Sequence, residues 1–565
     1  MKMKLPKALL VAVLSSTMAF GAGSYVTTEI ISVPEGEIKL SEDTDAYGYL
    51  TASITDPTSK FYLNYDQKDV ASGSDAPKAV VKDGQGTFII DKSFDTYNPF
   101  VVREGTVRIE AGVEINSYVK LVNAVSNLSV GGNNAHLVLD GATYTQDAAS
   151  GTRPNSAIAI GTTDGAGKLT LDNGAVLKNG HCIFAGYSQL SGYVTSTSVS
   201  ATDTNQYTNG VAGRSEINVL GGSTLGAGEW IQIANADVTV SGYVDGKRST
   251  LSDANYVLLE NYWGYMGRAD NSKSTISVKE GGLVDLQYGT WTGLGANSQS
   301  NITVDGKSGE TASTLKMGGT SFLGLGGYDY TTKAYASNGS STSITVTNGA
   351  QAYVGEVYMG EYDKVNITIG EKSLLGNVDE NNPQWIYVYD KGSIDNSGST
   401  EASICLSGGS FTAHDKSSMA ELYAYSGTFA VDGTVDAWGD ISLSNAEFIF
   451  ADGAVIDLNG NDFTFGEGSS ITIIMSELET QLVMLADADS TYEIQGITFN
   501  NAGSVTGLDG DIEVTLLSSA DADPENAQKV ILSASKVTVN PVPEPTTATL
   551  SLLALAGLAM RRRRK

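Results

Sequence analysis

INVLGGSTLGAGEWIQI, residues Ile217–Ile233, is the stretch that decides the fold, because its pattern returns further along the chain. It begins with a short strand of alternating apolar and polar residues, turns at a glycine pair, and enters a second strand with an aromatic residue. Alternation buries one face of a strand, and glycine permits the positive φ that a tight turn needs. Such a unit cannot bury its apolar face alone, so it has to stack on its neighbours.

Three later stretches follow the same pattern: ISVKEGGLVDLQYGTWTGLG (Ile276–Gly295), ITVTNGAQAYVGEVYMGEY (Ile344–Tyr362) and ICLSGGSFTAHDKSSMAELYAY (Ile404–Tyr425). Their starts lie 59, 68 and 60 residues apart, counted from Ile217. A second set of landmarks, SGYVDGK, NITVDGK and NITIGEK, recurs in the same order. A loose repeat of about 60 residues that holds two or three rungs predicts an all-β fold, an elongated right-handed parallel β-helix or β-solenoid.

The motif FVVREGTVRIEAG (Phe100–Gly112) makes this pattern similar in style to the passenger regions of autotransporter adhesins. No sign of their usual outer-membrane barrel is seen near the C-terminus, so self-transport is not supported. We expect five regions along the chain: a signal peptide at 1–23, an N-terminal cap at 24–98, the solenoid repeats at 99–430, last rungs or a closing β unit at 431–540, and a sorting segment at 541–565.

The first residues predict export. Lysines at positions 2, 4 and 7 precede an apolar run from Ala8 to Phe20, and small residues follow up to Gly23. A basic start, a short apolar stretch and a small-residue exit are typical of a signal peptide. The run is shorter than the ~20 residues that span a bilayer. We therefore expect a signal helix that is removed between Ala19 and Gly23.

The last residues predict a second signal. A stiff, proline-rich stretch is followed by an apolar segment, Thr546–Met560, which as a helix barely reaches across a ~30 Å hydrocarbon core. A cationic cluster then holds that end in the cytoplasm. The proline-rich motif consists of Val542, Pro543, Glu544 and Pro545, and the cluster consists of Arg561, Arg562, Arg563, Arg564 and Lys565.

In this order and spacing, the segment resembles the PEP-CTERM sorting signal, which is also named the C-terminal motif of ice-binding proteins. The resemblance implies recognition by an exosortase, a membrane protease-transpeptidase, with the Val542–Pro545 motif as recognition residues. It implies transient anchoring in the inner membrane, then delivery to the cell surface, the outer envelope or the exterior. The alternative is a proline linker before an ordinary tail anchor.

Composition limits the partners. The chain holds 64 Gly but only 11 Pro, which is typical of many short strands joined by tight turns. Its formal net charge of −29 disfavours binding to nucleic acid or anionic lipid. We interpret the acidity mainly as a source of solubility, with attraction of cations or basic partners as the alternative. Cys182 and Cys405 are expected to be small buried residues rather than a disulfide.

No cofactor, metal site or catalytic constellation is indicated. The three histidines, His136, His181 and His414, lack metal-ligand spacing. Since β-helices often act on polysaccharides, the alternative function is a lyase or glycoside hydrolase, whose site needs paired carboxylates. The acidic residues Asp245, Asp305 and Asp432 are better explained as turn residues that bond their own backbone.

Aromatic residues give the one positive indication of binding. Trp230, Trp291 and Tyr358 occupy matching repeat positions, and in a solenoid they form a ladder. An outward ladder suits the flat faces of sugars; an inward one is a core stack, which we favour. Tyr262, Trp263 and Tyr265 break the alternation and are the candidate ligand contacts. These features together predict a structural or adhesive surface protein that contacts glycans and is not an enzyme.

Overall fold

The computed structural model describes most of the repeat region and isolated strands on either side of it. The described residues are 17–20, 23–32, 36–38, 49–53, 60–63, 80–83, 85–91, 93–96, 100–117, 128–146, 157–161, 165–179, 182–187, 213–228, 230–253, 264–329, 332–379, 384–451, 454–475, 484–487, 492–494, 497–500, 504–506, 511–518, 528–533 and 541–542. Every regular element in these ranges is a strand. Within them, no helix is long and apolar enough to cross a bilayer.

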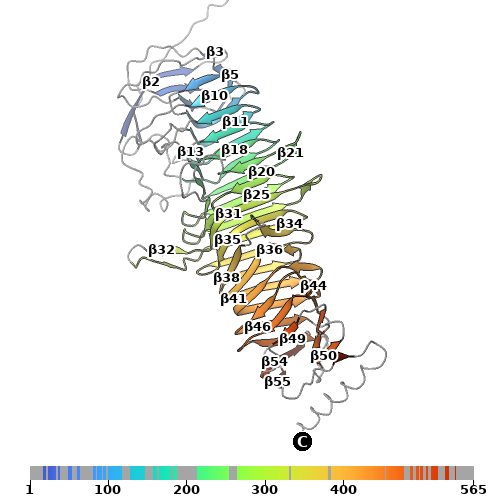
Figure 1. Ribbon diagram of the computed structural model, residues 1–565. Coiled ribbons are helices and arrows are strands. Elements are labelled where there is room, and N and C mark those ends of the chain that lie inside the picture. Colours follow the sequence, from blue (N-terminus) through green and yellow to red (C-terminus); the bar gives the residue numbers. More distant parts are fainter. Residues whose placement is uncertain are drawn as a thin grey trace, which may run out of the picture. The chain divides into compact units, whose positions relative to one another are not determined.

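The chain forms two compact units. Unit 1 comprises Met1–Thr303, Lys307–Lys316 and Asn338–Ser340, and unit 2 comprises Val304–Gly306, Met317–Ser337 and Ser341–Lys565. In each unit the chain passes in turn through three columns of parallel strands, named here A, B and C (Figure 1). Column B is the one most of whose strands run into a glycine- or asparagine-containing turn before column C. The predicted all-β parallel solenoid is therefore confirmed, while its handedness stays a prediction.

Successive strands within each column of unit 1 pair in parallel register. Column A contains β2 (Gly23–Ser32), β4 (Tyr49–Ser53), β6 (Val80–Asp83), the first parts of β9 (Phe100–Ile109) and β11 (Leu128–Asp140), β13 (Ala157–Ile160), β16 (Cys182–Ala185), β19 (Trp230–Ile233), β24 (Gly264–Met266) and β27 (Thr290–Thr292). Column B contains β3 (Gly36–Ile38), β5 (Lys60–Leu63), β7 (Thr87–Ile90), the second parts of β9 and β11, β14 (Gly167–Asp172), β17 (Ser215–Val219), β20 (Ala236–Ser241) and β25 (Lys273–Lys279). Column C contains β8 (Phe94–Thr96), β10 (Glu114–Ser117), β12 (Thr143–Gln146), β15 (Val176–Asn179), β18 (Thr224–Ala227), β23 (Thr250–Ser252) and β26 (Leu283–Leu286).

Unit 2 repeats the arrangement, and β28 (Gln299–Asp305) and β31 (Thr314–Leu323) have residues in both units. Column A contains the second part of β35 (Gln351–Met359), β38 (Trp385–Tyr389), the first parts of β41 (Ser403–His414) and β43 (Leu422–Asp432), β45 (Ile441–Leu443), β48 (Asp462–Phe465) and β53 (Ser504–Thr506). Column B contains β34 (Ser341–Thr347), β36 (Lys364–Ile369), β39 (Gly392–Asn396), the second parts of β41 and β43, β46 (Ala446–Ala451), β49 (Ser470–Met475) and β54 (Asp511–Ser518). Column C contains the first part of β35, β37 (Leu374–Asn377), β40 (Ser399–Thr400), β42 (Ser417–Met419), β44 (Thr434–Ala437), β47 (Val455–Asp457) and β52 (Ile497–Asn500).

The sequence repeat corresponds to two coils of the solenoid. Ile217 pairs with Val238, and Val238 pairs with Ile276, so the first 59-residue interval contains one additional rung of column B. The fourth stretch is out of phase, because Ile404 lies in column A whereas Ile344 lies in column B. The reason is that coils shorten in unit 2: Ile386, Ile404 and Leu422 are successive partners only 18 residues apart. Alternation alone does not tell one column from another.

The turns from column B to column C behave as the sequence predicts. Gly221 and Gly222 follow β17 with φ of 55° and 75°. A Cβ at Gly221 would lie 2.3 Å from Asp172 Oδ1 of the coil before, so a side chain has no room there. The buried Ser249 hydroxyl accepts a hydrogen bond from Gly222 N (3.0 Å) and donates to the Ser241 carbonyl (2.6 Å). Successive turns are thus joined by hydrogen bonds that leave little polar backbone unsatisfied.

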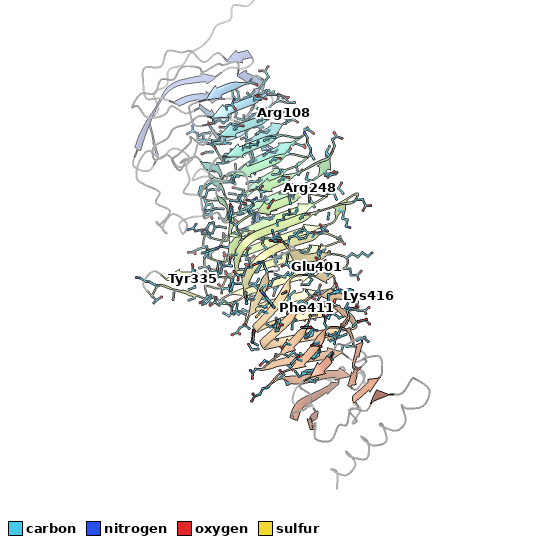
Figure 2. The ribbon with its side chains drawn as sticks, in the orientation of Figure 1. Arg108, Arg248, Tyr335, Glu401, Phe411 and Lys416 are labelled. Atoms are coloured by element: carbon cyan, nitrogen blue, oxygen red, sulfur yellow. The ribbon has the colours of Figure 1, made fainter. Side chains whose placement is uncertain are left out.

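Long side chains bind the coils of unit 1 from outside. Arg248 donates to the carbonyl oxygens of Gly281, Gly282 and Ala312 at 2.7–2.8 Å and to Thr314 Oγ1 at 2.8 Å (Figure 2). It lies in β22 (Lys247–Arg248), which pairs with β21 (Tyr243–Val244) as a hairpin between columns B and C. One guanidinium therefore joins its own hairpin to two further segments through Nε and Nη2.

An internal aromatic stack fills unit 2. Phe411, Phe429 and Phe448 are register partners in column B, and each is 0% exposed. The rings of Phe429 and Phe448 are parallel within 4°, with centroids 4.9 Å apart. This separation equals the usual spacing of neighbouring strands, so one ring lies directly over the next. Figure 2 labels Phe411 within this unit. The unit therefore does contain an inward aromatic stack, built from phenylalanines.

The described strands near the termini extend the same pairing. Parallel pairs already occur at β4–β6 and β5–β7, within the predicted cap, and continue to β49–β54 beyond residue 430. Antiparallel partners follow: β55 (Gln528–Ser533) pairs with β54, and β51 (Tyr492–Ile494) joins β52 to β50 (Met484–Asp487). β1 (Thr17–Phe20) is a strand paired with β2, so this part of the predicted signal helix is extended. Residues 1–16 and the predicted helix at 546–560 lie outside the described residues.

Candidate functional site

The sorting segment is placed only at its beginning. Pro541 and Val542 form β56 (Pro541–Val542), which pairs in parallel with β50. The other motif residues, Pro543, Glu544 and Pro545, and the cationic cluster at 561–565 lie outside the described residues. Their assigned roles therefore rest on the sequence.

Tyr265, one of the three predicted ligand contacts, is buried. It lies in β24 and is 8% exposed. Its ring meets Trp291 at 5.9 Å, and the guanidinium carbon of Arg268 lies 4.7 Å from the ring centroid. Tyr262 and Trp263 lie outside the described residues. The prediction of an exposed contact therefore remains open only for those two.

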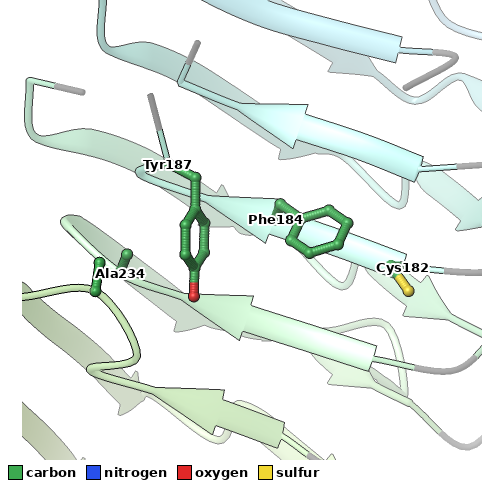
Figure 3. Close-up of a cluster of buried hydrophobic side chains, with 5 residues drawn as sticks. Cys182, Phe184, Tyr187 and Ala234 are labelled. Carbon is green, nitrogen blue, oxygen red and sulfur yellow. The ribbon is translucent and has the colours of Figure 1, made fainter. Parts of the chain in front are cut away.

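The outward side of column A in unit 1 carries a row of large side chains. Phe184, Gln232, Tyr265 and Trp291 are successive register partners. Phe184 is 9% and Gln232 0% exposed, and only Trp291 is half-buried. Figure 3 shows Phe184 beside Tyr187, with Cys182 on the same strand; the two rings meet edge-on at 6.0 Å. This outward row is therefore packed in the folded chain rather than available to a ligand.

Unit 2 carries an outward aromatic row that is half-buried along most of its length and exposed at Tyr425. Tyr358 alternates with Val357 and Met359, both 0% exposed, so its ring points away from the core. The preferred inward orientation of the predicted ladder was therefore wrong for Tyr358, and Trp291 alternates in the same way between two buried threonines. The side chain of Trp230 is not among those described. The aromatic strip, as named here, consists of Phe322, Tyr358, Trp385, Tyr387, Tyr423 and Tyr425.

The first three rings of the strip stack from coil to coil. Phe322 and Tyr358 are parallel within 12° with centroids 5.3 Å apart, and Tyr358 and Tyr387 are parallel within 12° at 4.8 Å. Tyr358 and Tyr387 are register partners. Because each ring covers the face of its neighbour, this part of the strip presents ring edges and hydroxyl groups outward. Its rigidity comes from the strand spacing beneath it.

The strip changes character at Cys405. This residue is the register partner of both Tyr387 and Tyr423, and it is 5% exposed. Its small side chain lets Trp385 and Tyr423, from the coils on either side, meet above it with centroids 5.4 Å apart and a tilt of 51°. Burial raises the pKa of the Cys405 thiol. Both cysteines are free and buried, as the sequence predicted.

Two aromatic side chains of unit 2, one in the strip and one outside it, are strongly exposed. Tyr425, at an irregularity in the β41–β43 pairing, is 64% exposed. Trp438, which precedes β45 in the next coil, is 65% exposed. Faces of these rings are open, unlike those in the stacked part. Exposed aromatic faces are the groups that sugars contact in water-filled sites, since their nonpolar area is released from solvent on binding.

Carboxylates accompany the tyrosines of the strip. The Tyr358 hydroxyl donates to Glu356 Oε1 at 2.9 Å, and the Thr320 hydroxyl donates to Oε2 at 3.3 Å. Burial and this bond raise the pKa of Tyr358 to about 12. A hydrogen bond to Glu421, with burial, raises the pKa of Tyr423 to about 12 in the same way. Both hydroxyls therefore stay protonated at neutral pH, with the proton directed to a carboxylate.

Two neighbouring carboxyl groups occur in unit 1, where Asp253 is buried and Asp285 is half-buried. Asp253 is 1% exposed; its Oδ1 accepts from Gln287 N at 2.8 Å, and its Oδ2 has no hydrogen-bond partner. Burial raises the pKa of Asp253 to about 7, and burial also raises the pKa of neighbouring Asp285. The Asp253 carboxyl is therefore closed to solvent in the folded chain.

The histidines and turn acids form no metal centre in the described chain, where no group of three or more ligand side chains converges. His136 Nε2 lies 3.0 Å from Thr170 Oγ1, and His414 Nε2 lies 2.6 Å from Asp395 Oδ1. His181 lies outside the described residues. Asp305 Oδ1 accepts from Thr347 (2.8 Å) and Asn348 (2.6 Å), so a turn acid joins two coils.

Comparison with known proteins identifies one segment. A family profile described as the PEP-CTERM protein-sorting motif matches residues 541–565. No curated protein matches the chain at a significant level. The chain therefore carries a PEP-CTERM sorting motif, which marks an exported protein that is sorted by an exosortase-type membrane enzyme.

Proposed function

We propose that this protein is a structural or adhesive component of the bacterial envelope, and that the aromatic strip of unit 2 is its contact surface for glycans. The observation that carries the proposal is the outward orientation of these rings. Core positions of the same strands are filled by aliphatic residues that are fully buried, so the strip is not needed to complete the interior. Aromatic residues on a rigid surface lose little conformational entropy on binding.

The sorting of the protein is part of the same proposal. The PEP-CTERM motif supports a precursor held briefly in the inner membrane and then released to the cell surface, the outer envelope or the exterior. We expect the mature protein to lack the signal peptide up to about Ala19 and the tail beyond about Pro545. Intact-mass measurement on material from the native envelope checks this, and recovery of the complete tail would contradict it.

The proposal assigns no catalytic role. The sealed Asp253 carboxyl supports this view, because general acids of glycoside hydrolysis must lie beside the scissile bond. The alternative, a polysaccharide lyase or hydrolase on a solenoid scaffold, predicts new reducing or unsaturated sugar ends when the protein meets its glycan. Detection of such ends above the level of a heat-inactivated sample would overturn the non-enzymatic assignment.

The binding experiment compares aromatic rings of the strip with an exposed ring outside it. Wild-type protein, a Trp385→Ala/Tyr425→Ala variant and a Tyr243→Ala control are incubated with a panel of insoluble polysaccharides, and depletion from solution is measured. Tyr243 is 39% exposed but belongs to the hairpin of unit 1 and not to the strip. We expect the double variant to lose at least about tenfold in affinity, as truncation of aromatic hot spots does, while the control binds normally. Equal binding by all three proteins would remove the strip from the function.

A further inference from the structure

The aromatic strip is rich in hydrogen-bond acceptors and poor in donors. The described column A strands of unit 2, from β35 to β48, contain no lysine or arginine. Lys391, in the turn after β38, has its ammonium group on the Tyr362 carbonyl. Acidic residues lie in or just before these strands at Glu356, Glu421 and Asp440. Their negative potential favours a ligand that carries positive charge.

The tyrosine hydroxyls strengthen the preference of the strip for a ligand that donates hydrogen bonds. At Tyr358 and Tyr423 the hydroxyl proton is directed to Glu356 and Glu421, so what each hydroxyl offers to a ligand is an acceptor oxygen. A carboxylate has about four lone-pair sites, and Glu356 uses one on each oxygen for Tyr358 and Thr320. Acceptor capacity therefore remains on both partners, and the group that complements it is a strong donor such as an ammonium.

Resting on the glycan-contact function above, we infer that the strip selects basic glycans, in which the sugars carry free amino groups. The ammonium groups lie against Glu356 and Glu421, where the aromatic rings add cation–π attraction. The nonpolar faces of the sugars contact the exposed ring of Tyr425 and the solvent-facing part of the half-buried Trp385 ring. One polymer of amino sugars supplies both kinds of contact, repeated along the coils. Its charge also complements the net −29 of the chain.

A pair of oligosaccharides, one with and one without free amino groups, tests the contribution of the ammonium charge to binding. The full-length secreted protein is titrated with a β-1,4-linked glucosamine hexamer and with its fully N-acetylated counterpart, which has the same sugar rings but no ammonium. We expect the free amine to bind at least about tenfold more tightly at low salt, and the difference to shrink as salt rises, because surface ion pairs are screened.

Matched variants test whether the preference for the free amine comes from the strip. Glu356→Gln/Glu421→Gln removes the two charges but retains acceptors for Tyr358 and Tyr423, and it should abolish the preference for the amine. Asp436→Asn is the control, because Asp436 is exposed on column C of the same unit. Circular dichroism checks that all variants fold alike.

The outcomes separate this inference from the function on which it rests. Equal affinity for the two hexamers, or a preference that survives the double substitution, would overturn the selection of basic glycans by the strip and leave glycan contact intact. If neither hexamer nor any polysaccharide of the panel binds, the glycan-contact function itself fails.

Discussion

The outward side of column A is more deeply buried in unit 1 than in unit 2. In unit 1 its register row contains Phe184, Gln232 and Tyr265, none of which is more than 9% exposed, and the half-buried Trp291. In unit 2 the corresponding row contains half-buried Tyr358 and Tyr387, and Tyr425 at the strip's end is 64% exposed. Both rows follow the same alternation with aliphatic residues inside. The comparison shows that the position of a ring in the coil decides whether it points inward or outward. Packing against other segments decides whether an outward ring is exposed to solvent.

The largest difference should appear in stability. Tyr265→Ala removes a buried ring that packs on Trp291 and should lower the free energy of unfolding by about 3–5 kcal/mol. Tyr425→Ala removes an exposed ring and should change it by no more than about 0.5 kcal/mol. Thermal and urea unfolding of the two variants measure both values. Equal losses would mean that the two rows do not differ in packing.

A pH dependence should be the next largest effect, and it belongs to unit 1. Burial raises the pKa of Asp253 to about 7 from 3.8, so between these values the folded state keeps a proton that the unfolded state has lost. Stability should therefore fall as pH rises through this window, by up to about 1.4 kcal/mol for each pKa unit. Asp253→Asn mimics the protonated form and should flatten the dependence, with the variant more stable than wild type above neutrality.

Urea unfolding at a series of pH values from mildly acidic to mildly basic measures this effect. Asp436→Asn, at an exposed position of unit 2, serves as the control and should follow wild type. A wild-type stability that stays constant or rises across the window would show that the Asp253 carboxyl is ionised in the fold.

The smallest effect concerns the thiol beneath the strip. Cys405 is 5% exposed, with Trp385 and Tyr423 meeting above it, and thiolate formation is needed for its reaction with disulfide reagents. We expect slow labelling of both cysteines in the folded protein. Trp385→Ala should accelerate labelling of Cys405 several-fold and leave Cys182 unchanged. Acceleration at both sites would indicate general loosening instead of an opened strip.

The fold could be predicted from the sequence because the residues that indicate its strands and turns are close together in the chain. Gly221–Gly222 and similar turn pairs mark where column B ends, and the alternation around Ile217 and Ile276 identifies the buried face. The length of a coil could not be predicted from the sequence, since about 60 residues fit two long rungs or three short ones. Ile404 consequently matched Ile344 by pattern although the two lie in different columns.

The candidate site was harder to predict from the sequence than the fold. The stretch WIYVY, Trp385–Tyr389, held the needed signal, because Ile386 and Val388 take the inward positions and leave the three aromatic residues outside. Tyr265 was misjudged for the opposite reason: it obeys the same alternation, yet it is buried by packing that involves Trp291, 26 residues further along the chain. Exposure depends on such long-range contacts, which periodicity does not report.

The most direct test of the account is hydroxyl-radical footprinting of the whole protein with and without a bound polysaccharide from the panel, read by mass spectrometry at each tyrosine. The account predicts protection at Tyr358, Tyr387 and Tyr425 in unit 2, little labelling of Tyr265 in either state, and no change at Tyr243 on the unit 1 hairpin. Protection centred on Tyr243, or unchanged labelling of all three strip tyrosines under saturating glycan, would contradict it.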